Sequence, residues 1–176
     1  MEELSLYKEI FEKVEGQVEE LAANAAENKL RSFSLKFESE IPNLERMSYI
    51  MEKVLIENGE GAKVYAGFQK LSRAEAIWDR YHQMADKADK IYVFGENDFD
   101  LEPHPKIELV NLSATHVLTR EWFLVIDKPA GKSMMVARDL DGFGKYENEK
   151  NRSFKGVKTN NPEDVARAVK LLKNLL

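Results

Sequence analysis

Apolar residues in the first thirty positions recur at intervals of three or four, with Lys and Glu between them. This spacing places them along one side of a helix, and the Ala-rich segment 21–30 has high helix propensity. The pattern predicts an N-terminal helical extension over residues 1–30, which is equally compatible with a docking or dimerisation arm and with a helix folded back on its own domain. The recurring positions are Leu4, Tyr7, Phe11, Val14, Val18 and Leu21.

The pattern then changes from weak alternation to a second helical repeat. Residues 32–42 alternate weakly between apolar and polar side chains until Pro42 interrupts them. Residues 43–61 predict a helix that begins with Asn43 as its N-cap and ends at Gly59. The predicted buried face of this helix contains Leu44, Met47, Ile50, Met51, Val54 and Leu55.

From residue 62 onward, strand patterns and helix patterns alternate. Residues 72–88 predict a helix with Ser72 and Glu75 as a capping box, and residues 161–176 predict a helix opened by Asn161 and Pro162. The remaining apolar runs are typical of strands. They occupy residues 62–69, 90–96, 106–112, 121–128, 133–140 and 152–159.

The connections between these elements predict the sheet topology. A strand–helix–strand unit over residues 62–95 predicts a right-handed parallel crossover, and the Pro-Ala-Gly connection at 129–131 predicts an antiparallel hairpin. We therefore expect an α/β fold. A mixed central sheet of about five to six strands would be flanked by helices, with the extra N-terminal helix beside a main domain of residues 31–176.

The bulk composition limits the class of protein. The chain has 176 residues, of which 43% are hydrophobic and 32% charged, a balance typical of a globular domain. No cysteine is present, which excludes disulfides and thiolate chemistry. A net charge of -5 argues against nucleic acid as a direct partner. The acidic start resembles neither a signal peptide nor a membrane span, so we expect a cytoplasmic protein with no membrane partner.

Motifs for catalysis, metals and phosphate groups are weak. Residues 129–133 (PAGKS) resemble the end of a phosphate-binding loop, but they lack its upstream glycine and fit a hairpin turn better. No GxSxG motif occurs, and the acidic run 95–102 lacks calcium-loop spacing. We therefore predict no enzyme, no metal site and no cofactor. The histidines, which show no metal-ligand pairing, are His82, His104 and His116.

The aromatic residues suggest a ligand-binding site. Aromatic side chains from several elements could form the wall of a small-molecule pocket, with nearby charged residues as polar contacts. The alternative is that the rings fill the core between sheet and helices, which we favour for any single one of them. The predicted ligand-binding residues are Phe68, Trp78, Phe94, Arg120, Glu121, Trp122 and Arg138.

Arg120 and Glu121 stand side by side at the start of a predicted strand. Because neighbouring strand residues point to opposite faces, only one of the two can face the interior. A buried Glu121 would need a partner, and Arg73 and Arg138 are the candidates. We interpret this charge pair as a structural contact or a ligand contact rather than as an acid–base pair.

Three segments carry a resemblance to a known family: KIYVFGEND, IELVNLSATHVLTREWFLVID and RSFKGVKTNNPEDVARAVKLL. LTREWFLV and the terminal F-x-G-V-x-T pattern are the most specific parts. Over residues 33–175 the chain resembles the DICT sensory domain, which is named for its presence in diguanylate cyclases and two-component systems. The matching positions are Phe94, Gly95, Arg120, Glu121, Trp122, Phe154, Gly156 and Thr159.

The resemblance implies a non-enzymatic, cytoplasmic signal-input domain. Such a domain would bind a small ligand or a partner and relay the event to an output kinase, cyclase or transcription regulator. Our hypothesis is that an occupied aromatic cleft shifts the loop 141–152 or the N-terminal helix, which requires unequal binding to the two states. The alternative is a ligand-free protein–protein interaction adaptor that forms a homodimer through its N-terminal helix.

Overall fold

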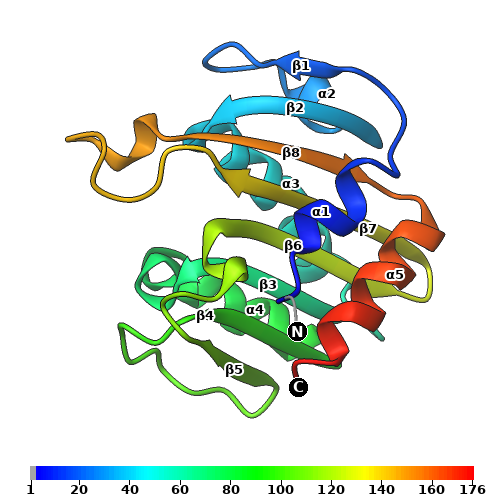
Figure 1. Ribbon diagram of the computed structural model, residues 1–176. Coiled ribbons are helices and arrows are strands. Elements are labelled where there is room, and N and C mark those ends of the chain that lie inside the picture. The colour runs from blue at the N-terminus through cyan, green and yellow to red at the C-terminus, as the bar shows by residue number, and fades with distance from the viewer. Residues whose placement is uncertain (1–2) are drawn as a thin grey trace.

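The computed structural model describes residues 3–176, and a single eight-stranded sheet forms its centre (Figure 1). The strand order is β1-β2-β8-β7-β6-β3-β4-β5. The α/β class is confirmed, and the sheet is larger than the five to six strands predicted. The strands are β1 Val18–Glu20, β2 Ser34–Glu40, β3 Lys63–Lys70, β4 Lys90–Glu96, β5 Ile107–Leu112, β6 Glu121–Lys128, β7 Gly131–Asp139 and β8 Ser153–Thr159.

Helices cover both faces of the sheet and give three layers (Figure 1). Helices α3 and α4 pack on one face, and α1 and α5 pack on the other. The α-helices are α1 Leu6–Phe11, α2 Glu27–Leu30, α3 Ile41–Asn58, α4 Trp78–Lys87 and α5 Pro162–Lys173. Short 3-10 segments are η1 Leu71–Ile77, η2 Val117–Arg120 and η3 Glu149–Asn151.

The sheet is mixed, and both predicted connections are confirmed. Strands β3 and β4 are parallel across the helical crossover, and β6 and β7 form the antiparallel hairpin. The parallel run continues into β5, whereas β3 pairs antiparallel with β6. As a result, the carboxyl ends of β3 and β4 lie at the same edge of the sheet as the start of β6.

The continuous helix predicted over residues 1–30 is wrong. Helix α1 ends at Phe11, strand β1 pairs in parallel with β2, and α2 has only four residues. Gly16 and Asn24 adopt positive φ angles of 115° and 56°, which a right-handed helix does not allow. Met1 and Glu2 lie outside the described residues. The division into a 1–30 extension and a 31–176 domain stays a prediction.

Two predicted helix caps are also wrong. Helix α3 begins at Ile41 with Pro42 in its first turn, so Asn43 lies inside the helix and its amide donates to the Ala22 carbonyl. Ser72 lies within η1 rather than before α4, and its N–H and hydroxyl donate to the Asp98 carboxylate at 2.8 and 2.6 Å. Both side chains form hydrogen bonds to other segments of the chain instead of capping a helix.

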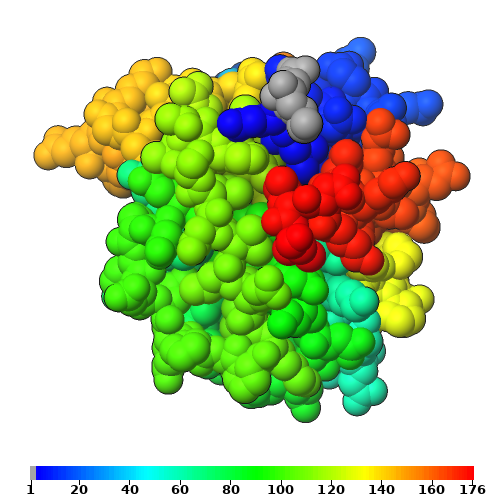
Figure 2. Space-filling view, turned by 60° about the horizontal axis from the view of Figure 1, so that its bottom comes forward, coloured from blue at the N-terminus to red at the C-terminus, as the bar shows by residue number. Residues whose placement is uncertain are grey.

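The C-terminal helix begins as predicted, because the Asn161 side chain accepts a hydrogen bond from the Glu163 N–H. Helix α5 lies next to α1, and Arg167 pairs with Glu9 at 3.2 Å between them (Figure 2). Leu6 and Ile10 of α1 are fully buried in the core that this pair of helices shares with the sheet. The N-terminal segment is therefore packed on its own chain.

Alternation along β3 separates two apolar cores. Ala66 and Phe68 face α3 and α4, whereas Tyr65 faces α1 and α5. Gly67 lies on the same face as Tyr65, directly under the Phe123 ring of β6, and a Cβ atom there would lie 2.2 Å from that ring. A side chain at position 67 is thus excluded by a neighbouring ring rather than by backbone conformation.

Candidate functional site

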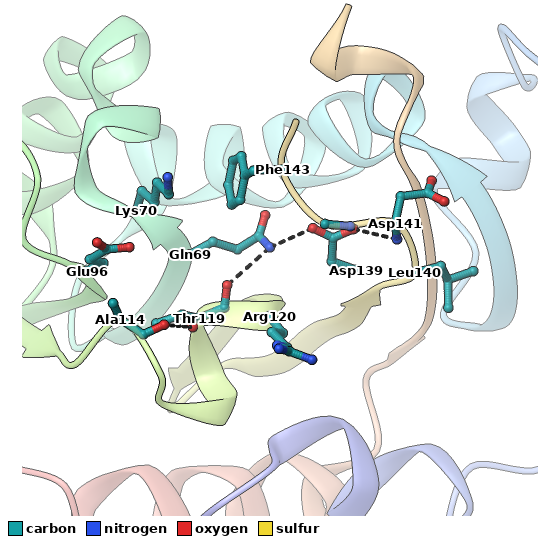
Figure 3. Close-up of a pocket in the computed structure, with 11 residues that line it drawn as sticks. Gln69, Lys70, Glu96, Ala114, Thr119, Arg120, Asp139, Leu140, Asp141 and Phe143 are labelled. Atoms are coloured by element: carbon teal, nitrogen blue, oxygen red, sulfur yellow. Dashed lines mark hydrogen bonds between the residues drawn. The ribbon is translucent and has the colours of Figure 1, made fainter. Parts of the chain in front are cut away.

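A polar cleft of about 380 Å³ lies where β3 and β4 end and β6 begins (Figure 3). Crevices at the carboxyl ends of parallel strands are the usual ligand-binding sites of α/β sheets. The loop 141–152 forms one wall of this cleft. The lining residues are Gln69, Lys70, Glu96, Ala114, Thr119, Arg120, Asp139, Leu140, Asp141, Gly142 and Phe143.

Gln69 holds the base of the cleft together. Its backbone has a φ of 69° at a β-bulge, a conformation that costs a non-glycine residue free energy. The buried side chain donates to the Thr119 carbonyl at 3.2 Å and to Asp139 at 3.0 Å (Figure 3). It also accepts a hydrogen bond from Arg73 at 2.6 Å. These contacts connect β3, η2, β7 and η1, and they offset the strained backbone.

A fully buried arginine attaches the loop 141–152 to the sheet. Arg152 pairs with Asp139 at 2.5 Å and with Glu149 at 3.0 Å. Its guanidinium also lies 4.0 Å from the centroid of the Phe143 ring, a cation–π distance. The segment that looked loop-like in the sequence is thus fixed by a buried charge.

Arg73 lies between the cleft and the aromatic side chains of the α3/α4 face. Its guanidinium is 5.1 Å from the Trp122 ring and 5.8 Å from the Phe143 ring. Within residues 3–176 it forms no ion pair, and its hydrogen bond goes to the neutral Gln69. Burial, with Arg152 nearby, lowers the pKa of Arg73 to about 10. Arg73 therefore has donors left for an anionic group.

A smaller aromatic cavity of about 80 Å³ lies beyond Arg73, between the sheet and helices α3 and α4. Phe68 and Trp122 form part of its wall, and the buried Ser48 hydroxyl has no hydrogen-bond partner within residues 3–176. On the same wall, Glu52 accepts hydrogen bonds from Arg80 at 2.7 Å and from the Tyr81 hydroxyl at 2.5 Å. Burial raises the pKa of Glu52 despite these donors.

The structure brings part of the predicted site together. Phe68 and Trp122 line the aromatic cavity, and Arg120 lines the polar cleft. Trp78 is on the same face of the sheet, where its ring stacks on Tyr81 at 6.0 Å and its Nε1 donates to the Glu102 carbonyl. Phe68, Arg120 and Trp122 thus line the two sites next to the start of β6, whereas Trp78 lines neither of them.

The other three predicted residues lie on the opposite face of the sheet. Phe94 packs against Phe123 at 5.6 Å in the core under α1 and α5. Arg138 pairs with Glu121 in the strand register, and its guanidinium lies 5.1 Å from the Tyr7 ring. Neither Phe94 nor Arg138 lines the polar cleft or the aromatic cavity.

Glu121 holds the first turn of α1, in a contact that we call the α1 anchor. Its carboxylate accepts hydrogen bonds from the Ser5 hydroxyl at 2.5 Å and from the N–H groups of Leu6 and Tyr7 at 3.0 and 3.1 Å. These three donors are neutral. Because burial outweighs them and the charge of Arg138, the pKa of Glu121 rises to about 7.

The opposite parity of Arg120 and Glu121 is confirmed, since Arg120 is exposed at the cleft and Glu121 is buried. The two arginines considered as partners of Glu121 form no ion pair with it within residues 3–176. Arg73 is on the other face, and Arg138 acts on the pKa of Glu121 without a hydrogen bond. Sequence reasoning missed the N-terminal donors, although Ser5 directly precedes the first apolar turn of the helix.

Three consecutive residues thus reach three different surroundings. Arg120 faces the polar cleft, Glu121 holds α1 on one face of the sheet, and Trp122 lines the aromatic cavity on the other. A movement of the strand start would act on all three at once.

Residues 3–176 contain neither a side-chain cluster suited to a metal ion nor a helix suited to a bilayer. No cluster of three or more His, Asp or Glu side chains that could hold a metal ion occurs in this part of the chain. Among its helices, none combines the length and the apolar character that crossing a bilayer requires.

Comparisons with known proteins place the chain in a signalling context. The family model described as a sensory domain in diguanylate cyclases and two-component systems (DICT) matches residues 4–140, a range that includes α1. No curated protein matches the chain significantly.

A solved structure with a similar fold is the crystal structure of polyphosphate kinase from Porphyromonas gingivalis. It has a TM-score of 0.52 and 12% sequence identity, and the match covers 76% of this chain and 22% of the kinase chain. The chain therefore spans about a fifth of that kinase. At this identity the likeness shows the fold alone.

Proposed function

Because the chain belongs to the DICT family of sensory domains, we propose that it is a non-enzymatic signal-input domain that acts in the cytoplasm. In this proposal it binds a small ligand and relays the binding to an output protein. The observation that carries the proposal is the start of β6, where Arg120, Glu121 and Trp122 connect a polar cleft, the α1 anchor and an aromatic cavity.

The polar cleft is the proposed ligand site. Asp139 is already paired with Arg152, and Asp141 with Lys145. Beside the carboxylate of Glu96, the cleft then offers cationic and aromatic side chains to a ligand. Arg120 is exposed at the cleft, and Lys70 lies 4.4 Å from the Phe143 ring. Arg73 adds a guanidinium without an ion pair in residues 3–176. This chemistry suits a small, polar ligand with an anionic group and a flat face.

The relay would pass from the cleft to α1. A ligand held by Arg120 would change the position of the β6 start, and the neighbouring Glu121 carries three hydrogen bonds to the α1 segment. Such a ligand shifts the equilibrium only by the difference in its affinity for the anchored and released states. An output kinase, cyclase or transcription regulator would then respond to the position of α1.

The adaptor alternative depended on the N-terminal helix as a dimerisation surface. Leu6, Tyr7, Ile10 and Phe11 of α1 are buried within their own chain, which leaves that helix no free apolar face while it is anchored. A dimer formed through α1 would first have to release it. We therefore favour ligand sensing over a constitutive adaptor.

A thermal-shift screen tests the ligand site. A panel of nucleotides, sugar phosphates and organic acids is expected to contain a compound that raises the melting temperature, because a ligand that binds only the native state stabilises it. Arg120→Ala and Phe143→Ala, which change two lining residues of the cleft, should abolish that rise, whereas the exposed control Lys173→Ala should keep it.

The relay has its own measurement. Hydrogen exchange at the Leu6 and Tyr7 amides should change on binding of the same compound, and Arg120→Ala should remove the change. Stabilisation without any change at these amides would contradict the relay. A panel with no stabilising compound would favour the adaptor.

A further inference from the structure

A second and larger groove, of about 500 Å³, lies at the opposite end of the sheet from the polar cleft. It runs between α3 and the ends of β6 and β8. We call it the α3 groove. Its lining residues are Arg31, Phe33, Ile50, Met51, Val54, Leu55, Ile126, Lys128, Ala130, Gly131, Lys132, Ser133, Lys158, Thr159 and Asn160.

The walls of the α3 groove are mainly apolar, and part of that apolar surface faces solvent. Ile50, Met51 and Leu55 line it from α3, with Ile126 on the sheet. Phe33 is 74% exposed and Val54 is 51% exposed at its margin. Apolar surface gathered in a concave site is typical of a binding site rather than of an ordinary protein surface.

The charged residues that line the α3 groove are all basic. Among its lining residues, all within the described part of the chain, there is no Asp or Glu. Lys128 is 8% exposed, and within residues 3–176 its ammonium has no hydrogen bond or ion pair. Lys132 also lines the groove, but it is already paired with Asp127.

Lys158 is the most confined of these cations, at 6% exposed. Its ammonium donates one hydrogen bond, to the Leu30 carbonyl at 2.7 Å, although an ammonium has three donors. Burial and the nearby Arg31 lower the pKa of Lys158 to about 8. A buried ammonium without a carboxylate is costly, and an anion bound beside it would reduce that cost.

From this combination we propose that the α3 groove binds a free amphipathic carboxylate. The carboxylate group would lie at Lys158, and the aliphatic body would lie against Ile50, Met51 and Val54, with Lys128 adding positive charge elsewhere in the same groove. Since Lys158 is more than nine-tenths buried, its ammonium group suits the head group of a single molecule inside the groove better than a flat bilayer surface. This site is separate from the signalling cleft and does not depend on the proposed function.

Calorimetric titration with three ten-carbon probes tests the charge requirement. Decanoate should bind at pH 7 at least ten times more tightly than decanol, and decyltrimethylammonium should not bind. Near pH 8, decanoate binding should be accompanied by proton uptake, measured as a buffer-dependent enthalpy, because the bound anion favours the charged form of Lys158. Equal affinity for decanoate and decanol would overturn the proposal.

Substitutions in and outside the α3 groove test whether decanoate binds there. Lys158→Met keeps the aliphatic stem and should weaken decanoate binding at least tenfold, whereas Lys128→Met should weaken it less. Val54→Glu should do the same by placing a negative charge at the groove margin. Asn58→Glu is the matched control: it adds the same charge at an exposed position of α3 outside the groove, and it should leave the affinity within twofold.

The remaining controls separate this site from folding, from membranes and from the cleft. Each variant should retain a cooperative thermal transition, and Arg120→Ala should bind decanoate as the unchanged protein does. Unaltered binding in Lys158→Met and Val54→Glu would overturn the proposal. So would binding to vesicles of phosphatidylcholine and phosphatidylglycerol without binding of monomeric decanoate.

Discussion

Two buried carboxylates on opposite faces of the sheet are held in different ways. Glu52 of α3 and Glu121 of β6 are each 1% exposed. Glu52 is bound by the guanidinium of Arg80 and the hydroxyl of Tyr81, so that an ion pair joins α3 to α4. Glu121 is bound by one hydroxyl and two backbone N–H groups, all from the N-terminal segment.

This difference distinguishes the α3/α4 layer, which an ion pair holds in place, from α1, whose attachment to the sheet depends on the α1 anchor. Helix α3 is 18 residues long and is held to α4 by a charge and its countercharge. Helix α1 has six residues, too few to be stable alone in water, so it depends on packing and on the α1 anchor. With its pKa raised to about 7, Glu121 changes charge under ordinary conditions. The α1 side is therefore the face on which a signal could act.

The largest expected effect on stability comes from the ion pair between α3 and α4. Glu52→Ala leaves Arg80 without its countercharge and Tyr81 without its acceptor, and it should lower the free energy of unfolding by about 3–5 kcal/mol. Urea denaturation measures this loss. Glu108→Ala is the control, because its ion pair with Lys90, at 3.7 Å, is partly exposed and should contribute less than about 1 kcal/mol. Equal losses of unfolding free energy in both variants would contradict a special role of the buried ion pair.

A smaller and more local effect is expected at the α1 anchor. Glu121→Ala leaves the N–H groups of Leu6 and Tyr7 unpaired, and it should cost about 2 kcal/mol. Hydrogen exchange should accelerate at the α1 amides and stay unchanged in α3. Glu9→Ala, which removes the exposed pair with Arg167, is the matched control on the same helix. Faster exchange throughout both helices would mean that the two faces are not independent.

The smallest effect, when it is counted per pH unit, is a dependence of stability on pH. Since the pKa of Glu121 is raised in the folded protein, the native state keeps a proton that the unfolded chain has lost between about pH 5 and 7. Stability contributed by this group should therefore fall as the pH rises, by up to about 1.4 kcal/mol per pH unit, and level off above pH 7. Denaturation at pH 5, 6, 7 and 8 should give a flatter curve for Glu121→Gln. Parallel curves for the two proteins would contradict this assignment.

The sequence predicted most of the sheet and little of its N-terminal edge. Strands with strong apolar runs, such as 90–96 and 121–128, lie where they were expected. Strand β1 was missed because its three residues, Val-Glu-Glu, are all exposed and carry no alternation. The helical spacing of the first thirty residues was misleading, because left-handed turns at Gly16 and Asn24 interrupt it.

For the site, local alternation predicted which neighbouring residues face apart, but not how the faces of different strands are related. Alternation shows that Arg120 and Glu121 face apart, and it cannot show that Phe94 and Trp122 point to opposite faces of the sheet. The buried network around Arg152 and Gln69 was missed as well. It depends on a bulge and on contacts between residues up to 83 positions apart, which local patterns do not contain.

The contact between Gly67 and Phe123 has a consequence for how this sheet can vary. The Phe123 ring occupies the space that a methyl group at position 67 would need, and Phe94 of β4, on the other side of β3, packs against that ring. A larger residue at 67 is therefore tolerable only if position 123 becomes smaller at the same time. In related sequences, a larger side chain at position 67 should therefore occur together with a smaller one at position 123, because one substitution makes the other acceptable.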